Sequence, residues 1–342
     1  MRHIMRKIAS WESMTRPALS RQRKFGKRWT RFVSYSAFVV LYLLLKQVPR
    51  AGRFQTSYES HVKKKYTCSI GRPPWLNLDA RKELQAFNKV FVERPGGENK
   101  FGASFFHYFA LWCTIRSLQP KFIIESGINQ GVGSWFLRQA AGPAADMVFI
   151  SPRDPVTYKD SKHTTLYFTE KEFLDFSNIE WDAIIPAASR ADDTIIFFDD
   201  HQAGVRRIEE AREAGFKHLV FDDNYLPGCG DNLSPKMICL APIYPLLGAT
   251  TFKFLDNFGK ETKNISAEVF YEIQSRFYQS VDIYAEFPPV WRGSNRFGVE
   301  EEKWEKLTQD ALFLASELAF VRDVDFHAEA RRYTHILYIQ TS

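Results

Sequence analysis

The chain of 342 residues lacks several residue patterns that mark common functional classes. No two of its four cysteines have the spacing of zinc ligands, which argues against a zinc-binding module. It has no Gly-Lys-Ser/Thr phosphate loop and no Gly-x-Ser-x-Gly turn, so P-loop nucleotide hydrolases and hydrolases with a nucleophile elbow are excluded too. The chemistry of this chain must be inferred from other motifs.

Acidic residues are almost missing from the first 31 positions. Residues 1–31 contain ten Lys and Arg and a single acid, Glu12, which gives this leader a charge of +9. The net charge of the chain is +6, so the remainder carries about −3. Binding to nucleic acid depends on a positively charged surface. We therefore expect no nucleic-acid partner.

Long hydrophobic runs are scarce, and the run that follows the leader is short. Residues 32–45 are fourteen residues without a charge, whereas a membrane span needs roughly 20. Extension to 32–48, with Lys46 reaching back to the interface, gives a marginal length. With its basic flank, this segment predicts a single-pass type II membrane anchor facing the ER or Golgi lumen. The alternatives are a mitochondrial or other organelle transit peptide and a buried or interfacial helix.

The cysteines neither require nor exclude an oxidising compartment. Cys229 and Cys239 lie ten positions apart around a loop rich in Gly and Pro, and this spacing permits a disulfide. Cys113 lies in an apolar helical pattern and is expected to be a buried thiol.

The rest of the chain divides by pattern into a stem (49–75), an α/β domain (76–255) and an aromatic-rich C-terminal extension or cap (256–342). Helical spacing of apolar residues comes first, and strands then alternate with helices. The predicted strands are 121–126, 147–151, 165–168, 194–199 and 217–222. The predicted helices are 79–92, 103–118, 134–141, 170–177 and 202–214. This alternation predicts an α/β fold with a doubly wound, mostly parallel sheet.

Residues 122–134 combine a buried strand, a glycine-rich turn and the beginning of a helix. Gly127, Gly131 and Gly133 permit backbone angles and a close ligand approach that a side chain would prevent. The helix offers free N–H groups above the sheet. This arrangement predicts a site for a nucleotide-type cofactor. The spacing of the glycines, four and two apart, excludes the dinucleotide fingerprint of nicotinamide enzymes.

Two later strands end in acids, at Asp199-Asp200-His201 and at Asp222-Asp223-Asn224. The carboxyl ends of neighbouring strands line one crevice in an open α/β sheet. Carboxylates that are crowded there repel one another unless a cation or a proton intervenes, so a divalent cation is the simplest expectation. In the alternative, the acids only cap helices, and His201 has a structural role.

Residues 125–134 resemble motif I of class I S-adenosylmethionine-dependent methyltransferases, in the form Glu-x-Gly-x-x-x-Gly. The segments 198–201 and 220–224 are similar to the acidic elements of the branch that methylates hydroxyls of small molecules and sugars. The resemblance covers about 105–240. It implies a Rossmann-like methyltransferase fold that binds S-adenosylmethionine, with Mg²⁺ as an optional metal.

The resemblance also implies roles for individual residues. The cofactor would be held by Glu125, Gly127, Asn129, Gly131, Ser134 and Asp154. The metal ligands would be Asp199, Asp200, Asp222 and Asp223. The catalytic residues would be His201, as the base, and Asp200.

The predicted function is thus a membrane-anchored O-methyltransferase that acts on a glycan or a small hydroxylated metabolite. Two alternatives stay open. One is a type II glycosyltransferase that uses a sugar nucleotide and Mn²⁺. The other is a non-catalytic protein that has kept a methyltransferase-like scaffold.

Overall fold

The computed structural model describes residues 68–96, 103–226, 233–240, 252–256, 261–265, 267–291 and 310–342. All of them belong to the compact unit His61–Ser342. The predicted leader and anchor lie outside the described residues. Within the described ranges, no helix combines the length and apolar character needed to cross a membrane.

One eight-stranded sheet organises this unit, in the order β1-β9-β10-β6-β5-β2-β3-β4. Five neighbouring strands of the sheet run parallel to one another. They are β2 (Phe122–Ser126), β3 (Asp146–Ser151), β4 (Leu166–Thr169), β5 (Thr194–Phe198) and β6 (His218–Phe221). All five were predicted from the sequence to within two residues at each end. Because the chain runs outward from β2 to β4 and then returns to β5 on its other side, the sheet is doubly wound.

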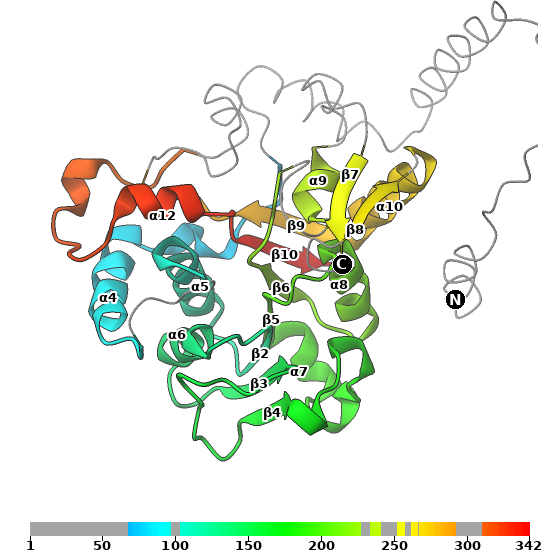
Figure 1. Ribbon diagram of the computed structural model, residues 1–342, viewed down its shortest axis with the longest axis horizontal. Helices are drawn as coiled ribbons and strands as arrows, with labels where there is room; N and C mark the ends of the chain where they lie inside the picture. The colour runs from blue at the N-terminus through cyan, green and yellow to red at the C-terminus, as the bar shows by residue number, and fades with distance from the viewer. Residues whose placement is uncertain are drawn as a thin grey trace, which may run out of the picture. The chain divides into compact units, whose positions relative to one another are not determined.

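Helices cover both faces of the sheet, as Figure 1 shows. One side carries α4 (Ala80–Val92), α5 (Phe105–Leu118) and α6 (Val132–Ala141). The other carries α7 (Ala187–Asp192) and α8 (Gly204–Glu213). The predicted helices over 79–92, 103–118, 134–141 and 202–214 are confirmed.

Alternating strand residues divide the core into two clusters, because successive side chains of a strand point to opposite faces. Ile123 and Phe197 pack with the aromatic residues of α4, α5 and α6. Their neighbours Ile124 and Phe198 pack with Ile208 of α8 and the apolar residues beyond it. Burial on both faces explains why the parallel strands read as continuous apolar runs.

The helix predicted at 170–177 is wrong. The segment instead forms two separate 3-10 turns, η3 (Glu170–Glu172) and η4 (Phe176–Asn178), followed by η5 (Trp181–Ala183). Phe176 is fully buried, and its carbonyl accepts a hydrogen bond from the Trp181 indole at 3.1 Å. Tertiary packing of these two aromatic residues therefore overrides the helical pattern.

Strands from the two ends of the described unit complete the sheet. The short β1 (Ser69–Ile70), which falls in the predicted stem, pairs with β9 (Val281–Glu286). The last strand, β10 (Leu337–Thr341), lies antiparallel between β6 and β9. The region 256–342, predicted as extra strands and a cap packed on the domain, thus supplies two strands of the main sheet. Their antiparallel pairing gives no β/α alternation in the sequence.

The remaining elements lie between β6 and β10 in the chain. They are α9 (Pro235–Cys239), the hairpin β7 (Phe252–Asp256) and β8 (Glu261–Ile265), α10 (Ala267–Ser280), the 3-10 helix η7 (Ala315–Leu318) and α12 (Phe326–Arg332). The 3-10 helix η2 (Pro74–Asn77) precedes α4.

A disulfide joins Cys68, beside β1, to Cys239 at the end of α9. The predicted pair Cys229–Cys239 is therefore wrong, and Cys229 lies outside the described residues. The sequence spacing misled because β1 and α9 are 171 residues apart and meet only in the folded sheet. Cys113 is a free, buried thiol, as predicted.

Candidate active site

The glycine turn after β2 packs directly against the end of β5. Gly127 has a φ of +103°, and a Cβ there would collide with the carbonyl group of Asp199. Asn129 follows with a φ of 44°. The need for glycine at position 127 thus comes from the close approach of two backbone segments, which holds the turn beside the acids that follow β5.

Glu125 lies under the first turn of α6 and is only 1% exposed. The Ser134 hydroxyl donates a hydrogen bond to its carboxyl group. A Cβ on Gly133 would stand 2.5 Å from Oε1, so glycine at this position makes room for the carboxyl group. Burial raises the pKa of Glu125 to about 8, although the Ser134 hydrogen bond opposes this shift.

A pocket opens above Glu125 and the glycine turn, with an empty volume of about 250 Å³ that includes open solvent. It is lined by Ala103, Tyr108, Glu125, Gly127, Ile128, Asn129, Gln130, Val132, Gly133, Phe197 and Asp199. Of the residues predicted to hold a cofactor, Glu125, Gly127 and Asn129 line this pocket.

The other three predicted cofactor residues lie outside the lining. Gly131 packs against the backbone of Tyr158, and the Ser134 hydroxyl is bound to Glu125. Asp154 accepts hydrogen bonds from Thr169 and from Lys159, and these donors lower its pKa. Asp154 therefore joins the loop after β3 to the edge strand β4.

Three residues from two strand ends form an acid cluster, which we define as Asp199, His201 and Asp223. Their potential ligand atoms all lie within 4.8 Å of one another. Nδ1 of His201 is 3.1 Å from Oδ2 of Asp223. The pKa of Asp199 is raised well above its usual value by burial and by the nearby charges of Asp222 and Asp223. A cation or a proton here would relieve this repulsion.

Asp200 and Asp222, which the sequence also predicted as metal ligands, are placed differently. Both carboxylate oxygens of Asp200 accept hydrogen bonds from the protein itself, from Ser126, Gln202 and Arg207. Asp222 is 7% exposed and adds its charge at Asp199 without belonging to the acid cluster. The structure therefore supports Asp199 and Asp223 as candidate ligands, and it adds His201.

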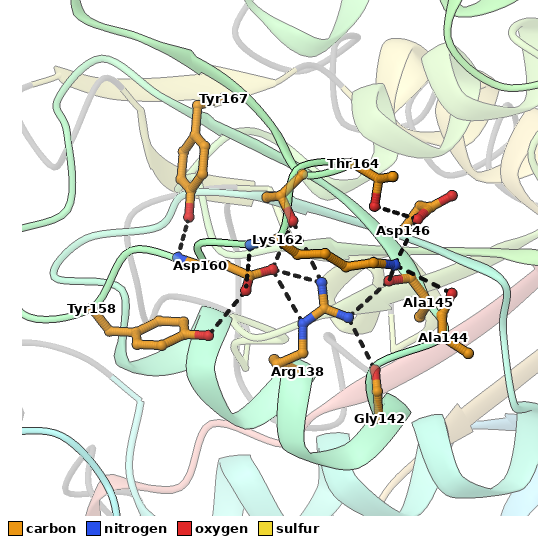
Figure 2. A network of polar contacts seen from close by, with 11 residues as sticks. Arg138, Gly142, Ala144, Ala145, Asp146, Tyr158, Asp160, Lys162, Thr164 and Tyr167 are labelled. Carbon is orange, nitrogen blue, oxygen red and sulfur yellow. Dashed lines mark hydrogen bonds and ion pairs between the residues drawn. The ribbon is translucent and has the colours of Figure 1, made fainter.

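The loop between β3 and β4 is fixed over the glycine turn and α6. Figure 2 shows Arg138 of α6 reaching Asp160, with Nη2 2.6 Å from Oδ2, while Nη1 donates to the Ala145 carbonyl at 2.8 Å. The Asp160 amide donates to the Tyr167 hydroxyl at 2.7 Å. Arg138 and the Asp160 side chain are both largely buried, so the pair is shielded from solvent.

The same loop reaches the glycine turn directly. The backbone amides of Thr157 and Tyr158 both donate to the Gln130 carbonyl, at 3.0 and 3.2 Å. Gln130 itself lines the pocket, so this contact ties the loop to the pocket wall. No helix connects β3 to β4, and this loop takes the place of one.

Some buried charged residues were missed by sequence reasoning. Arg207 is 1% exposed on the buried side of α8, a position where an amphipathic pattern predicts an apolar residue. Lys236 and Glu286 form an ion pair in which both side chains are fully buried, with Nζ 2.8 Å from Oε2. Fifty positions separate these two residues, and no local pattern indicates that they meet.

The comparisons with known proteins give few matches. No family model matches the chain. No curated protein matches it either.

Solved structures provide some likeness. The SAH-bound methyltransferase PaMTH1 of Podospora anserina is 10% identical, covers 95% of this chain and 100% of its own, and gives a TM-score of 0.33. Cofactor-bound Rv0187 from MTB is 13% identical, covers 55% of this chain and 88% of its own, and gives a TM-score of 0.27. An O-methyltransferase from Bacillus cereus in complex with SAH is 14% identical, covers 55% of this chain and 89% of its own, and gives a TM-score of 0.26.

At these identities and TM-scores, the assignment of the fold rests on the strand order of this chain. The parallel strands extend from β2 in both directions along the sheet, to β3 and β4 on one side and to β5 and β6 on the other. Helices cover both faces. These are the defining features of a doubly wound sheet. The chain therefore has a Rossmann-like α/β fold.

Proposed function

We propose that the unit 61–342 is an S-adenosylmethionine-dependent O-methyltransferase that acts on a glycan or a small hydroxylated metabolite. One observation carries this proposal. The pocket is lined both by Glu125 with its glycine turn and by Asp199 of the acid cluster. A methyl donor held by the first group would thus lie beside acids and an imidazole that can handle a hydroxyl proton.

The residues fit such a donor at one end. S-adenosylmethionine carries a methyl group on a positively charged sulfur and an amino acid group. Glu125 would face the positively charged end, and the backbone at Gly127 and Asn129 would contact the ligand from the side. Holding the acceptor oxygen about 3 Å from the methyl carbon would contribute most of the rate.

The acid cluster would act on the acceptor. With Nδ1 against Asp223, the remaining ring nitrogen of His201 is the one that can take the proton of an acceptor hydroxyl. Asp223 would then stabilise the imidazolium ion that forms. Asp199, at the wall of the pocket, is placed to orient the hydroxyl group.

The donor set of the acid cluster also fits a divalent cation. Two carboxylates and an imidazole can supply three ligand atoms. Burial, together with the charges of Asp222 and Asp223, raises the pKa of Asp199, and a cation would oppose this shift. We therefore include Mg²⁺, held by Asp199, Asp223 and His201, as an alternative arrangement in which the ion, and not the imidazole, activates the acceptor hydroxyl. Such an ion would lower the pKa of the acceptor hydroxyl.

Calorimetric titration of residues 61–342 with S-adenosylmethionine, with and without Mg²⁺, tests the proposal. We expect a Kd in the range of about 1 µM to 1 mM, as for enzyme substrates in general. Asp154→Asn is the matched control, because this acid was predicted to bind the cofactor but lies outside the pocket lining. Its affinity should equal that of the wild type, whereas Asn129→Ala should weaken binding.

The first rival is the non-catalytic protein. That rival gains if neither S-adenosylmethionine nor a sugar nucleotide binds. Binding of a sugar nucleotide with Mn²⁺, without binding of S-adenosylmethionine, would instead support a glycosyltransferase.

We further propose that 32–48 anchors the protein in a membrane of the early secretory pathway, with the folded unit in the lumen. The Cys68–Cys239 disulfide supports this placement, because disulfides persist in oxidising compartments and are rare in the cytosol. The residues of the anchor lie outside those that the structure describes.

A further inference from the structure

The turn after β5 brings His201 into the acid cluster through an unusual backbone conformation. His201 has a φ of 56°, in the left-handed region that residues other than glycine seldom adopt. Such a conformation persists only where surrounding contacts enforce it. The contacts that do so here come from the residue before it, Asp200.

The Asp200 carboxylate is held by four donor contacts. Oδ2 accepts from the Ser126 hydroxyl at 2.7 Å and from Nε and Nη2 of Arg207 at 2.9 and 2.7 Å. Oδ1 accepts from the backbone amide of Gln202 at 3.1 Å, which closes the turn around His201. Ser126 directly follows Glu125, so one carboxylate joins the strand that supports the pocket to the turn that carries the imidazole.

Arg207 is the buried centre of this network. Its side chain is 1% exposed and contacts three carboxylates, those of Asp200, Asp175 and Glu210. Asp175 is bound in a two-pronged arrangement, with distances of 2.7 and 3.0 Å. Burial alone would raise the pKa of Asp175, but the Arg207 guanidinium lowers it to about 2, so this ion pair stays charged at neutral pH.

We propose that Arg207 is a positioning residue: through Asp200 it fixes the left-handed turn that places the His201 imidazole against Asp223. Asp200 is then a structural acid of the site and is neither a metal ligand nor a base. The inference deepens the proposed function, on which its catalytic meaning rests. The placement of the imidazole can nevertheless be measured without any catalysis.

Two substitutions weaken the network from opposite ends. Asp200→Asn keeps the shape of the side chain but turns an amide NH₂ toward N–H or O–H donors. Asp175→Asn removes a charge from the far side of Arg207 and touches no residue of the acid cluster. Asp182→Asn is the matched control, because Asp182 is the carboxylate partner of a different buried arginine, Arg190.

The readout is the imidazole nitrogen signals of His201 in the full chain, purified in detergent and labelled with ¹⁵N-histidine. The His201→Ala variant assigns them. In the wild type we expect the signals of a proton held on Nδ1 beside Asp223. In Asp200→Asn and Asp175→Asn they should shift toward those of a solvated ring, while Asp182→Asn leaves them unchanged.

Ligand binding supplies the second readout. Residues that orient a metal ligand typically change metal affinity by about 10-fold to 100-fold. Asp200→Asn should therefore weaken Mn²⁺ binding about tenfold or more. Its affinity for S-adenosylmethionine should stay within about twofold of the wild type, because the substitution leaves the cofactor contacts intact.

Unchanged His201 signals in both network variants would overturn the proposal. So would an equal shift in the Asp182→Asn control, because the effect would then report general stability. A wild type that does not bind S-adenosylmethionine defeats the proposed function alone. The nitrogen signals would still decide whether Arg207 positions the imidazole.

Discussion

At the scale of single residues, two glycines separate the effects of backbone angle and close packing. Gly127 and Gly142 both have a positive φ, of 103° and 76°. A Cβ on Gly142 would meet nothing within 4 Å, whereas a Cβ on Gly127 would collide with the backbone of Asp199. Position 127 therefore requires glycine both for its backbone angle and for its close packing, whereas position 142 requires it for the backbone angle alone.

We expect Gly142→Ala to lower the free energy of unfolding by about 1 to 2 kcal/mol, because its backbone angles, φ 76° and ψ −175°, lie in a region almost confined to glycine. Gly127→Ala should cost clearly more, on the order of 3 kcal/mol, because the end of β5 has to move as well. Urea unfolding of the two variants measures both values. Equal losses would show that the turn has room for a side chain.

A second residue-scale prediction concerns the pH dependence of stability. In the folded protein the pKa of Glu125 is raised to about 8, from the usual value of 4.5. Between these two values the folded state keeps a proton that the unfolded state has lost, so stability falls as pH rises from 4.5 to 8. The full shift corresponds to a few kcal/mol, on the order of 1.4 kcal/mol per pKa unit.

Glu125→Gln should remove this slope, because the amide does not titrate and resembles the protonated acid. Unfolding free energies of the variant and the wild type, measured at pH 5, 6.5 and 8, test the expectation. Their difference should increasingly favour the variant as pH rises. A constant difference would mean that Glu125 is ionised throughout.

At the scale of elements, the sequence predicted the parallel half of the sheet and the helices that follow its strands. These elements have strong periodic patterns, and Gly215 after α8 marks a helix end. The antiparallel strands β9 and β10 were not resolved in advance. Their place between distant neighbours depends on pairing that a local pattern does not carry.

The candidate site shows the same division. Clustering of Asp199, His201 and Asp223 follows from the rule that strand ends share one edge of the sheet. The role of Asp200 could not be predicted, because its partner Arg207 is a charged residue at a buried helical position. Which of two adjacent aspartates faces a ligand depends on side-chain contacts alone.

The ion pair between Lys236 and Glu286 joins α9 to β9, and it permits a test at this scale. Lys236→Met should lower the free energy of unfolding by about 3 to 5 kcal/mol, because it leaves a buried carboxylate without its partner. The double variant Lys236→Met, Glu286→Gln removes both charges. We expect it to recover a large part of the loss.

Chemical denaturation of both variants measures this coupling. A double variant that is less stable than Lys236→Met would show that Glu286 matters for another reason. Asn224 and Tyr284 also donate to this carboxyl group, at 3.1 and 2.8 Å, and the glutamine retains an acceptor for them.

At the scale of the whole molecule, the disulfide links the beginning of the described unit to α9, across 171 positions. Loss of a native disulfide typically costs about 2 to 5 kcal/mol. We expect Cys68→Ser to lower the melting temperature and to abolish the effect of reductant on it. The same reductant should destabilise the wild type.

Cellular material offers a further check on this bond. Non-reducing peptide mapping of the protein from cells should recover the peptides of Cys68 and Cys239 as one cross-linked species. Recovery of both as free thiols would contradict the proposed luminal placement.

The position of β10 has a consequence for biosynthesis. This strand, the last in the chain order of the sheet, fits between β6 and β9, both of which the ribosome makes earlier. Until residues 337–341 emerge, the nascent chain holds two strands with open edges and a gap between them. Such edges are prone to pair wrongly. Chaperones are therefore expected to bind this protein until β10 has been made, and loss of residues 337–341 would separate β1 and β9 from the five parallel strands.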